Sequence, residues 1–229
     1  MNIIGIDMSI NSPAVVYFEL DDDLEVTKKE YLTFSKTKKN LTNDILLCRN
    51  NDFDNEYDKY MYVRDNIKEF LQDKKIDYAA IEGYSFNSSG KVFNIAEITC
   101  LIKIYLYEER RIPFRIYEPT SIKMFFAMDG RADKISMEKV YDKIDVNDRF
   151  DLSFLPKVYE TDSNGGNPAD NIIDAYFIAK LLQVELKLRH GLLRVKDLKE
   201  LKRIQVFNKV SDKKGGNLLD VDFIERKLV

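Results

Sequence analysis

Apolar residues at the start of the chain form short runs that are separated by turn-forming residues. Asn2 to Ser9 and Ala14 to Leu20 are mostly apolar, and Glu25 to Phe34 alternates polar and apolar side chains. Runs of this length and period are typical of β-strands. The Asn-Ser-Pro and Asp-Asp-Asp segments between them favour tight turns. We therefore expect three consecutive strands arranged as an antiparallel meander.

After this meander, helical and strand-like patterns alternate. A polar segment, residues 35–55, has the composition of an insertion that leads into an amphipathic helix. Buried strands are expected at 78–82 and 114–117. Helices are expected at 56–73, 91–110, 119–126, 134–143, 167–189 and 196–204. A meander followed by alternating helices and strands predicts an α/β fold in which helices cover a mixed sheet.

Composition narrows the classes of function. The chain has 229 residues, and 36 Lys and Arg against 39 Asp and Glu give a formal net charge of -3, so any phosphate-facing surface must be local. Two cysteines and one histidine cannot build a Cys/His zinc site or a disulfide framework, so a metal must be held by oxygen. The same low cysteine count, together with no export signal and no long apolar stretch, leads us to expect a cytoplasmic protein that does not enter a membrane.

Four carboxylates occupy positions that need an explanation. Asp7 lies in the apolar run IIGID, Glu82 ends the run AAIE, and Asp170 and Asp174 lie one turn apart on the helix that follows Asn167. A carboxylate in apolar surroundings costs several kcal/mol unless it is paired or binds a cation. Divalent cations offset the repulsion between converging acids, and two Mg²⁺ ions, or Mn²⁺ in their place, support phosphodiester hydrolysis. The pattern therefore predicts a metal-dependent nuclease.

Four segments in the same order carry a resemblance to a known family. IIGIDMS, AIEGYSF, PTSIK with GRADK, and PADNIIDAYFIA resemble the motifs of the RuvC-like Holliday junction resolvases of the ribonuclease H-like superfamily, most closely the forms encoded by phages. The resemblance implies a mixed five-stranded sheet with strand order 3-2-1-4-5 and a homodimer. It also implies cleavage of four-way DNA junctions in recombination and repair, with two Mg²⁺ ions per active site and, for a phage protein, in the host cytoplasm.

By this resemblance, Asp7, Glu82, Asp170 and Asp174 are the catalytic metal ligands. Lys134 in GRADK matches a basic residue that acts electrostatically on the scissile phosphate. DNA contacts are expected from an aromatic residue soon after Glu82, either Tyr84 or Phe86, which would enter the junction. Positive charge is expected to gather around Lys91, Arg131 and Lys134. The lysine-rich tail after His190 suits either contacts with the DNA backbone or plain solvation; its basic residues are Lys199, Lys202, Arg203, Lys209, Lys213 and Lys214.

The last motif departs from the family pattern. The family usually has two acids spaced by two residues, and the second matches Asp174, but the first position holds Asn171 and Asp170 precedes it. Either Asp170 substitutes for the missing acid, or Asn171 contributes its carbonyl oxygen. A plain alternative for Asp170 is a negative charge favoured by the dipole in the first helical turn.

Other functions fit parts of the pattern. A nuclease of the same fold that acts on forks, flaps or RNA-DNA hybrids would use the same chemistry. An actin-like ATPase shares the first strand and meander but needs a second phosphate-binding half. A non-catalytic DNA-binding module would not need four acids. We expect residues 1–189 to form the nuclease domain, with the insertion at 35–55, and residues 190–229 to be an extension rather than a separate domain.

Overall fold

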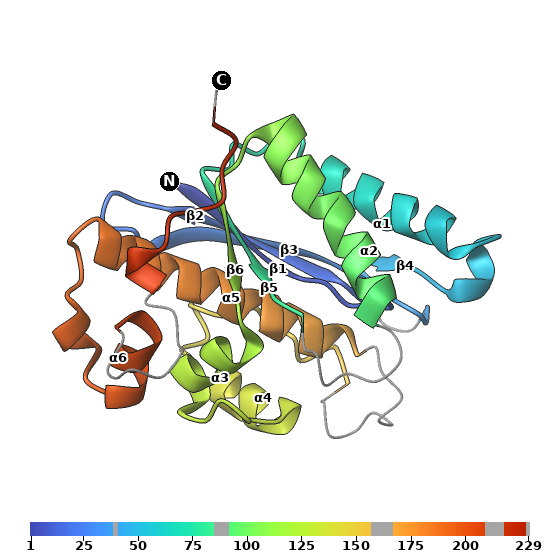
Figure 1. Cartoon of the computed structure of the whole chain (residues 1–229). Helices are drawn as coiled ribbons and strands as arrows, with labels where there is room; N and C mark the ends of the chain where they lie inside the picture. Colours follow the sequence, from blue (N-terminus) through green and yellow to red (C-terminus); the bar gives the residue numbers. More distant parts are fainter. Residues whose placement is uncertain (39–40, 85–91, 157–166, 209–217, 228–229) are drawn as a thin grey trace.

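A mixed sheet of six strands runs through the centre of the molecule, with helices on both faces (Figure 1). The computed structural model describes residues 1–38, 41–84, 92–156, 167–208 and 218–227. The strands are β1 (Asn2–Asp7), β2 (Ala14–Leu20), β3 (Val26–Ser35), β4 (Ile45–Leu47), β5 (Tyr78–Glu82) and β6 (Phe114–Tyr117). The first three form the predicted antiparallel meander, whereas β5 and β6 run parallel to β1.

The sheet has one strand more than expected. Its order is β4-β3-β2-β1-β5-β6, so five strands keep the predicted order and β4 is added beside β3, parallel to it. This strand lies inside the segment predicted to be an insertion, where Ile45 pairs with Thr33 and is buried. The prediction missed β4 because three apolar residues among polar ones are too few to show a period.

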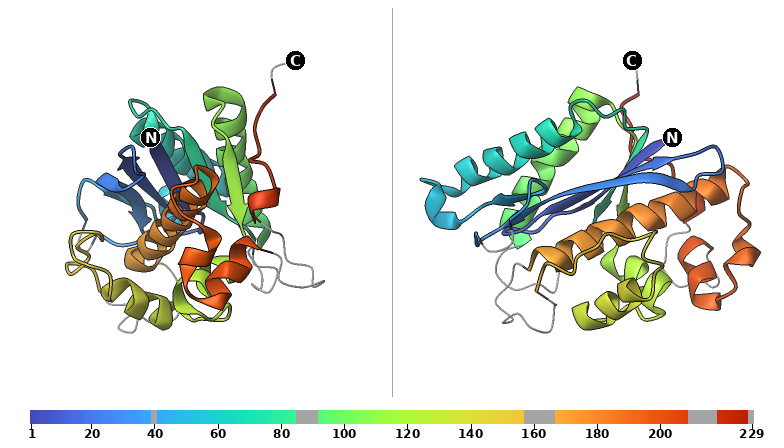
Figure 2. Two further views of the ribbon diagram at one scale, coloured as in Figure 1. Left: turned by 90° about the vertical axis from the view of Figure 1, so that its left-hand side faces the viewer. Right: turned by 180° about the vertical axis from the view of Figure 1, so that it is seen from behind.

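The helices form a layer on each face of the sheet (Figures 1 and 2). One layer contains α1 (Glu56–Leu71) and α2 (Val92–Ile104). The long helix α5 (Pro168–Arg189) crosses the other face, with α3 (Pro119–Ala127) and α4 (Lys134–Asp142) packed against it and α6 (Leu201–Phe207) against α3. Shorter helical turns are η1 (Asn50–Asp52), η2 (Tyr105–Arg110), η4 (Val195–Leu198) and η5 (Leu218–Asp220).

Two of the expected helices are interrupted. The helix predicted over 91–110 is α-helical only to Ile104 and continues as the π-helix η2. The helix predicted over 196–204 divides into η4 and α6 because Lys199 between them has a positive φ of 64°, which an α-helix does not accommodate. Within the described ranges, no helix has the length and apolarity needed to span a membrane.

Alternate residues of β1 serve two separate cores. Ile4 and Ile6 pack in the core beneath α1 and α2. Gly5 points to the opposite face, where an added Cβ would lie 2.4 Å from the carbonyl oxygen of Ala175 and 2.4 Å from the backbone nitrogen of Ala179. The glycine therefore lets the backbone of α5 lie directly against β1, and the side chains beside this contact come close to the end of the strand.

The C-terminal half of α5 carries a buried ionic cluster. The carboxylate of Glu185 is fully buried and accepts hydrogen bonds from Arg115 at 2.5 Å, from the Tyr117 hydroxyl at 2.6 Å and from Arg189 at 2.8 Å. Two guanidinium groups and a hydroxyl thus neutralise and saturate this carboxylate.

The last described segment, residues 218–227, packs on the edge of the sheet. Ile224 and Phe114 form an antiparallel bridge with N–H···O distances of 2.8 and 2.9 Å. Backbone carbonyls of the segment also accept hydrogen bonds from Arg115 and Arg189. The segment is therefore tied both to β6 and to the buried ionic cluster.

Two basic residues of the lysine-rich tail contact the end of α3. Lys202 donates to the carbonyl oxygen of Met128 at 2.6 Å, and Arg203 donates to that of Phe125 at 3.0 Å. Both contacts satisfy carbonyl groups at the C-terminal end of a helix, where basic side chains are favourable.

Candidate active site

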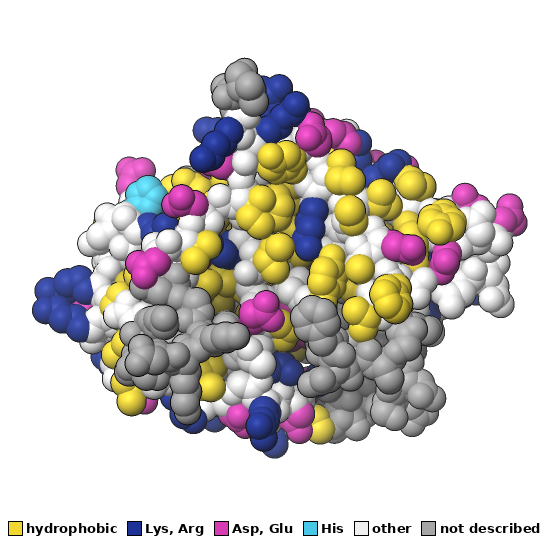
Figure 3. Space-filling model, viewed as in Figure 1, with side chains coloured by type: hydrophobic (Ala, Val, Ile, Leu, Met, Phe, Trp, Pro, Cys, Tyr) yellow, Lys and Arg dark blue, Asp and Glu magenta, His cyan; other side chains and the backbone are white. Residues whose placement is uncertain are grey.

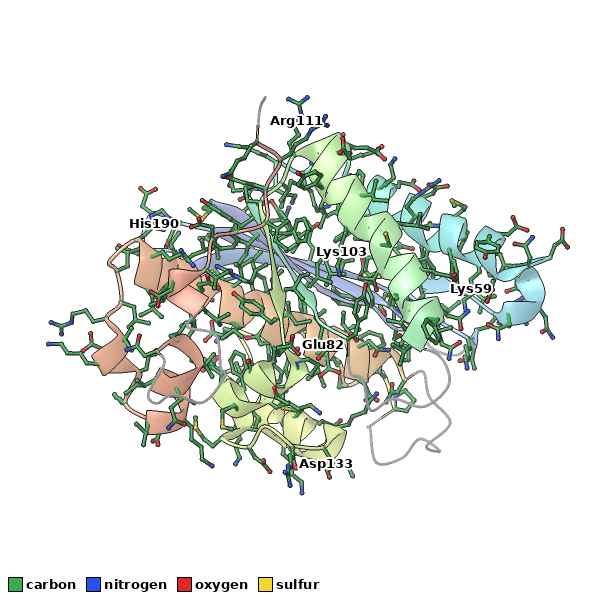
Figure 4. All side chains as sticks on the ribbon, in the orientation of Figure 1. Lys59, Glu82, Lys103, Arg111, Asp133 and His190 are labelled. Carbon is green, nitrogen blue, oxygen red and sulfur yellow. The ribbon has the colours of Figure 1, made fainter. Side chains whose placement is uncertain are left out.

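Asp7 and Glu82 end two neighbouring parallel strands. Asp7 is the last residue of β1 and Glu82 the last residue of β5, and these strands pair directly. Gly5 and Ala80, two positions earlier, face α5, so the alternation along each strand also turns Asp7 and Glu82 toward α5. Glu82 accordingly lies near the point where α5 crosses the sheet (Figure 4). The two carboxyl groups meet at one edge of the sheet.

The first two turns of α5 supply the other two acids. Asn167 caps the helix by accepting a hydrogen bond from a backbone N–H in the first turn, at 3.1 Å. Asp170 follows and is 7% exposed, and Asp174 precedes Ala175, whose backbone lies against β1. The close packing at Gly5 thus places Asp174 beside the ends of β1 and β5.

One cavity of about 370 Å³ joins these groups, and its wall includes Asp7, Glu82, Lys134, Asn171 and Asp174. The sequence-predicted acids on three separate elements therefore share a cavity with the predicted basic residue. Cavities that collect titratable groups in this way are candidates for active sites.

Lys134 and Asp170 form an ion pair beside this cavity. Lys134 is the first residue of α4, which Asp133 caps by accepting from the Ser136 N–H at 2.8 Å. Its ammonium group donates to Oδ2 of Asp170 at 3.0 Å. Oδ1 of Asp170 is buried and has no hydrogen-bond partner among the described residues. A buried oxygen of this kind costs free energy unless something else binds it.

Burial and mutual repulsion raise the pKa of three of the acids. Burial, followed by the charges of Asp174 and Asp170, raises the pKa of Asp7 to about 8, although Lys134 opposes the shift. Burial and the charge of Asp7 raise the pKa of Glu82 well above its ordinary value. Burial and the charge of Asp170 raise the pKa of Asp174 to about 6, again opposed by Lys134. The surroundings provided by the protein therefore disfavour the ionised form of these acids.

The pKa of Lys134 moves in the complementary direction. Burial acts to lower it, but the carboxylates of Asp170, Asp174 and Asp7 outweigh burial and raise it. Lys134 therefore stays cationic at neutral pH and provides a fixed positive charge in the cavity.

The donor chemistry of this site suits a hard divalent cation. All four acids offer oxygen ligands; Asp7, Glu82 and Asp174 line the cavity, and Asp170, whose Oδ1 has no partner among the described residues, is joined to it through Lys134. Among the described residues, no three Asp, Glu, His or Cys side chains are arranged as a metal-binding group. Lys134 holds Asp170, and burial raises the pKa of Asp7, so the ionised form of these acids is disfavoured without a cation. A cation bound by their oxygens would stabilise that ionised form.

The residues predicted to contact DNA have different positions. Tyr84 lines the cavity, and Lys103 of α2 donates to its hydroxyl at 3.2 Å and lies 4.6 Å from its ring centroid. Arg131 is exposed in the turn before α4. Phe86 and Lys91 lie outside the described residues.

Sequence reasoning overlooked Lys123 of α3 as a member of this site. Its charge lowers the pKa of both Glu82 and Asp174, so it lies close to the cavity. The signal was present, since Lys123 is the lysine of the PTSIK segment. Asn171, weighed against Asp170 from the sequence, lines the cavity and donates to the Ser12 hydroxyl at 2.5 Å. The structure therefore brings both Asp170 and Asn171 to the site.

The fold of this chain is similar to that of solved structures. No family model and no curated protein matches the chain. The chain is similar to RuvC of Thermus thermophilus, with 15% sequence identity, a TM-score of 0.51, and coverage of 84% of this chain and 98% of that chain. A structure of T. thermophilus RuvC in complex with Holliday junction substrate gives 14% identity, a TM-score of 0.50, and coverage of 84% and 97%. A complex of Fowlpox virus resolvase with substrate Holliday junction DNA gives 15% identity, a TM-score of 0.43, and coverage of 81% and 99%. The chain therefore has the ribonuclease H-like fold seen in RuvC, a mixed sheet flanked by helices.

Proposed function

We propose that this protein is a cytoplasmic, metal-dependent endonuclease that resolves four-way (Holliday) DNA junctions as a homodimer. The observation that carries the proposal is the meeting of Asp7, Glu82, Asp174 and Lys134 in one cavity, at the edge where the parallel strands end. The fold supports it, since one similar structure is described as RuvC in complex with Holliday junction substrate.

Asp7, Glu82, Asp170 and Asp174 would hold two Mg²⁺ ions, with Mn²⁺ as a substitute. When bound, such ions supply a hydroxide nucleophile and stabilise the leaving oxygen of a phosphodiester. Burial and mutual repulsion disfavour the ionised form of Asp7, Glu82 and Asp174, and a bound cation would stabilise that form. Lys134 presents a positive charge to the non-bridging oxygens of the scissile phosphate, where negative charge grows in the transition state.

Pairing of two subunits would give two nicks at symmetric positions. The outer side of α2 is apolar: Phe93 is 84% exposed and Ile104 is 50% exposed. Figure 3 shows hydrophobic side chains gathered over this helix. Exposed apolar surface of this kind is typical of interaction sites, and we propose α2 as the dimer contact.

Cleavage assays test the proposal directly. The full-length protein is incubated with Mg²⁺ or Mn²⁺ and a mobile four-way junction, a fork, a flap, a plain duplex or an RNA-DNA hybrid. We expect the four-way junction to be cut fastest, by paired nicks. Asp22→Asn in the exposed β2–β3 turn is the control for the loss of an acid and should leave cleavage unchanged. A strong preference for the hybrid or the flap would instead favour a related nuclease with the same active site.

A further inference from the structure

A second cavity adjoins the candidate active site. It encloses about 320 Å³, and we call it the insertion pocket because the segment predicted to be an insertion forms much of its wall, which includes Ile10, Asn50, Phe53, Lys59, Tyr60 and Asn94. Ile10 directly follows Met8 and Ser9, which line the catalytic cavity. Asn94 lies between Val92 and Ile95, which also line it. The linings of the two cavities are therefore adjacent along the chain at two places.

The distance between the cavities matches a few nucleotides. Three residues of chain lead from Asp7 to Ile10, a span of at most about 11 Å. Successive phosphates of one strand of B-DNA are about 3.4 Å apart along the axis. A nucleotide within about three positions of the scissile phosphate can therefore reach the insertion pocket.

Hydrogen bonds connect the wall of the pocket to the catalytic helix. Lys59 is 3% exposed, and its ammonium group donates to the side-chain oxygen of Asn50 at 2.9 Å and of Asn11 at 3.5 Å. Ser12, the next residue, accepts from Asn171 of α5 at 2.5 Å. The buried lysine thus fixes the insertion to the loop after β1, and that loop is fixed to α5. Figure 4 shows Lys59 on α1, beside the start of α2.

The groups in the pocket suit a planar, neutral and polar ligand. Phe53 offers an aromatic face, and Asn50 and Asn94 offer amide groups. Asn94 is held by donating to Glu56 at 2.5 Å and to the hydroxyl of Tyr60 at 2.8 Å. Asp54 and Glu56 also line the pocket, and their two negative charges outnumber the one positive charge of Lys59, which disfavours a phosphate group there. Aromatic faces and amides are the groups with which proteins recognise unstacked nucleobases.

We propose that the insertion pocket binds an unstacked base of the DNA strand to be cut, within about three nucleotides of the scissile phosphate, and so gives cleavage a base preference. This inference rests on the proposed function and extends it to the selection of the cleavage site. It also gives the segment 35–55 a role, because Asn50 and Phe53 belong to it.

Two variants change the pocket without touching the proposed metal ligands. Asn50→Trp, at an exposed position, fills the pocket and also removes an acceptor of Lys59, whereas Asn94→Leu removes an amide with a side chain of similar shape and leaves Lys59 its acceptors. Asn66→Ala, on the same helix α1 but outside the pocket, is the control. The full-length proteins are given Mg²⁺ and four-way junctions in which each of the three positions on either side of the cut carries each base in turn.

For the wild-type protein, we expect cleavage with the best base at one position to be at least about tenfold faster than with the worst. Both pocket variants should reduce this ratio to less than about twofold, and Asn66→Ala should keep it. The inference is wrong if the pocket variants retain the wild-type profile, or if the wild-type protein cuts junctions with no base preference. Should Asn94→Leu not fold, Asn50→Trp provides the test alone.

Fluorescence of 2-aminopurine separates this inference from the proposed function. The base analogue is placed at each of these positions in a junction, and Asp7→Asn protein is added so that the DNA stays intact. Unstacking into the pocket raises the fluorescence, and adding Asn50→Trp to this variant should abolish the rise. Cleavage by the wild-type protein without any rise would contradict the pocket. A rise with a junction that the wild-type protein never cuts would support the pocket and contradict the proposed function.

Discussion

The two ends of helix α5 both hold buried acids against the sheet, but they neutralise them to different extents. At the C-terminal half, Glu185 accepts from Arg115, Tyr117 and Arg189. At the N-terminal half, Asp170 has one cationic partner and an oxygen with none among the described residues. The first arrangement is complete by itself and serves stability. The second has charge left to neutralise, which is the property expected of a site that binds a cation.

The largest effect is expected on catalysis, when one acid of the candidate active site is replaced. Asp7→Asn or Asp174→Asn keeps the shape of the site but removes a charged ligand, so we expect cleavage of a four-way junction to fall by at least about 1000-fold. Single-turnover cleavage measures this loss, and circular dichroism checks that the fold is intact. Junction cleavage that survives both substitutions would show that the catalytic site lies elsewhere.

The other end of α5 should respond in the opposite manner. Glu185→Gln leaves the buried guanidinium group of Arg115 and the partly exposed one of Arg189 without their carboxylate, and we expect the free energy of unfolding to drop by about 3–5 kcal/mol. Urea denaturation measures this change. At a temperature where the variant is folded, its cleavage rate should remain within a few-fold of the wild-type rate. A large loss of cleavage by folded protein would mean that this cluster also serves the active site.

Gly5 connects the two ends, because α5 rests on it. In Gly5→Ala, the new methyl group meets backbone atoms of α5, which cannot rotate away, so α5 must shift. We expect a loss of about 1–3 kcal/mol in stability and a reduced cleavage rate, because Asp174 moves with the helix. Gly191→Ala is the control: its Cβ meets nothing within 4 Å, so only the cost of a positive φ should appear, without loss of cleavage.

The last expected effect is a dependence of stability on pH in the metal-free protein. Asp7 and Asp174 have pKa values raised to about 8 and about 6, so the folded, metal-free protein keeps protons that the unfolded chain has released. Stability in EDTA should therefore fall as the pH rises from about 4 to about 8. Thermal melts across this range measure the slope, and Asp7→Asn should flatten it. Mg²⁺, which needs deprotonated ligands, should bind more tightly as the pH rises. Parallel pH profiles for the two proteins would contradict the raised pKa of Asp7.

Features carried by local patterns could be predicted from the sequence. The short apolar runs before Asp7 and before Glu82 were enough to predict the strands that place two acids at one edge, and the four-residue spacing put Asp170 and Asp174 on one side of α5. The order of the five main strands also agrees with the prediction. The structure brings the predicted acids and Lys134 together, but their catalytic role stays a prediction.

Features that depend on contacts between distant segments could not be predicted. β4 is a strand because β3 offers a free edge, and Ile45 to Leu47 alone carry too little pattern. Lys59 has the sequence context of a solvated helix residue, yet it is buried because Asn50 and Asn11, distant in the chain, accept its hydrogen bonds. The contact of Lys103 with Tyr84 likewise joins a helix to a loop. Contacts of this kind between distant segments leave no periodic pattern in the sequence.

The bridge between Ile224 and Phe114 has a consequence for how the protein associates. An open strand edge is a template on which another chain can extend the sheet, and natural proteins protect such edges. Here the C-terminal segment occupies part of one edge, and the strand at the other edge, β4, is only three residues long. β4 pairs with β3 only at Thr33 to Ser35, and the part of β3 before it carries Lys28, Lys29 and Glu30, charged residues of the kind that disfavour growth of a sheet at an open edge. Self-association through helical faces is thus favoured, and removal of residues 218–227 would create an aggregation-prone border.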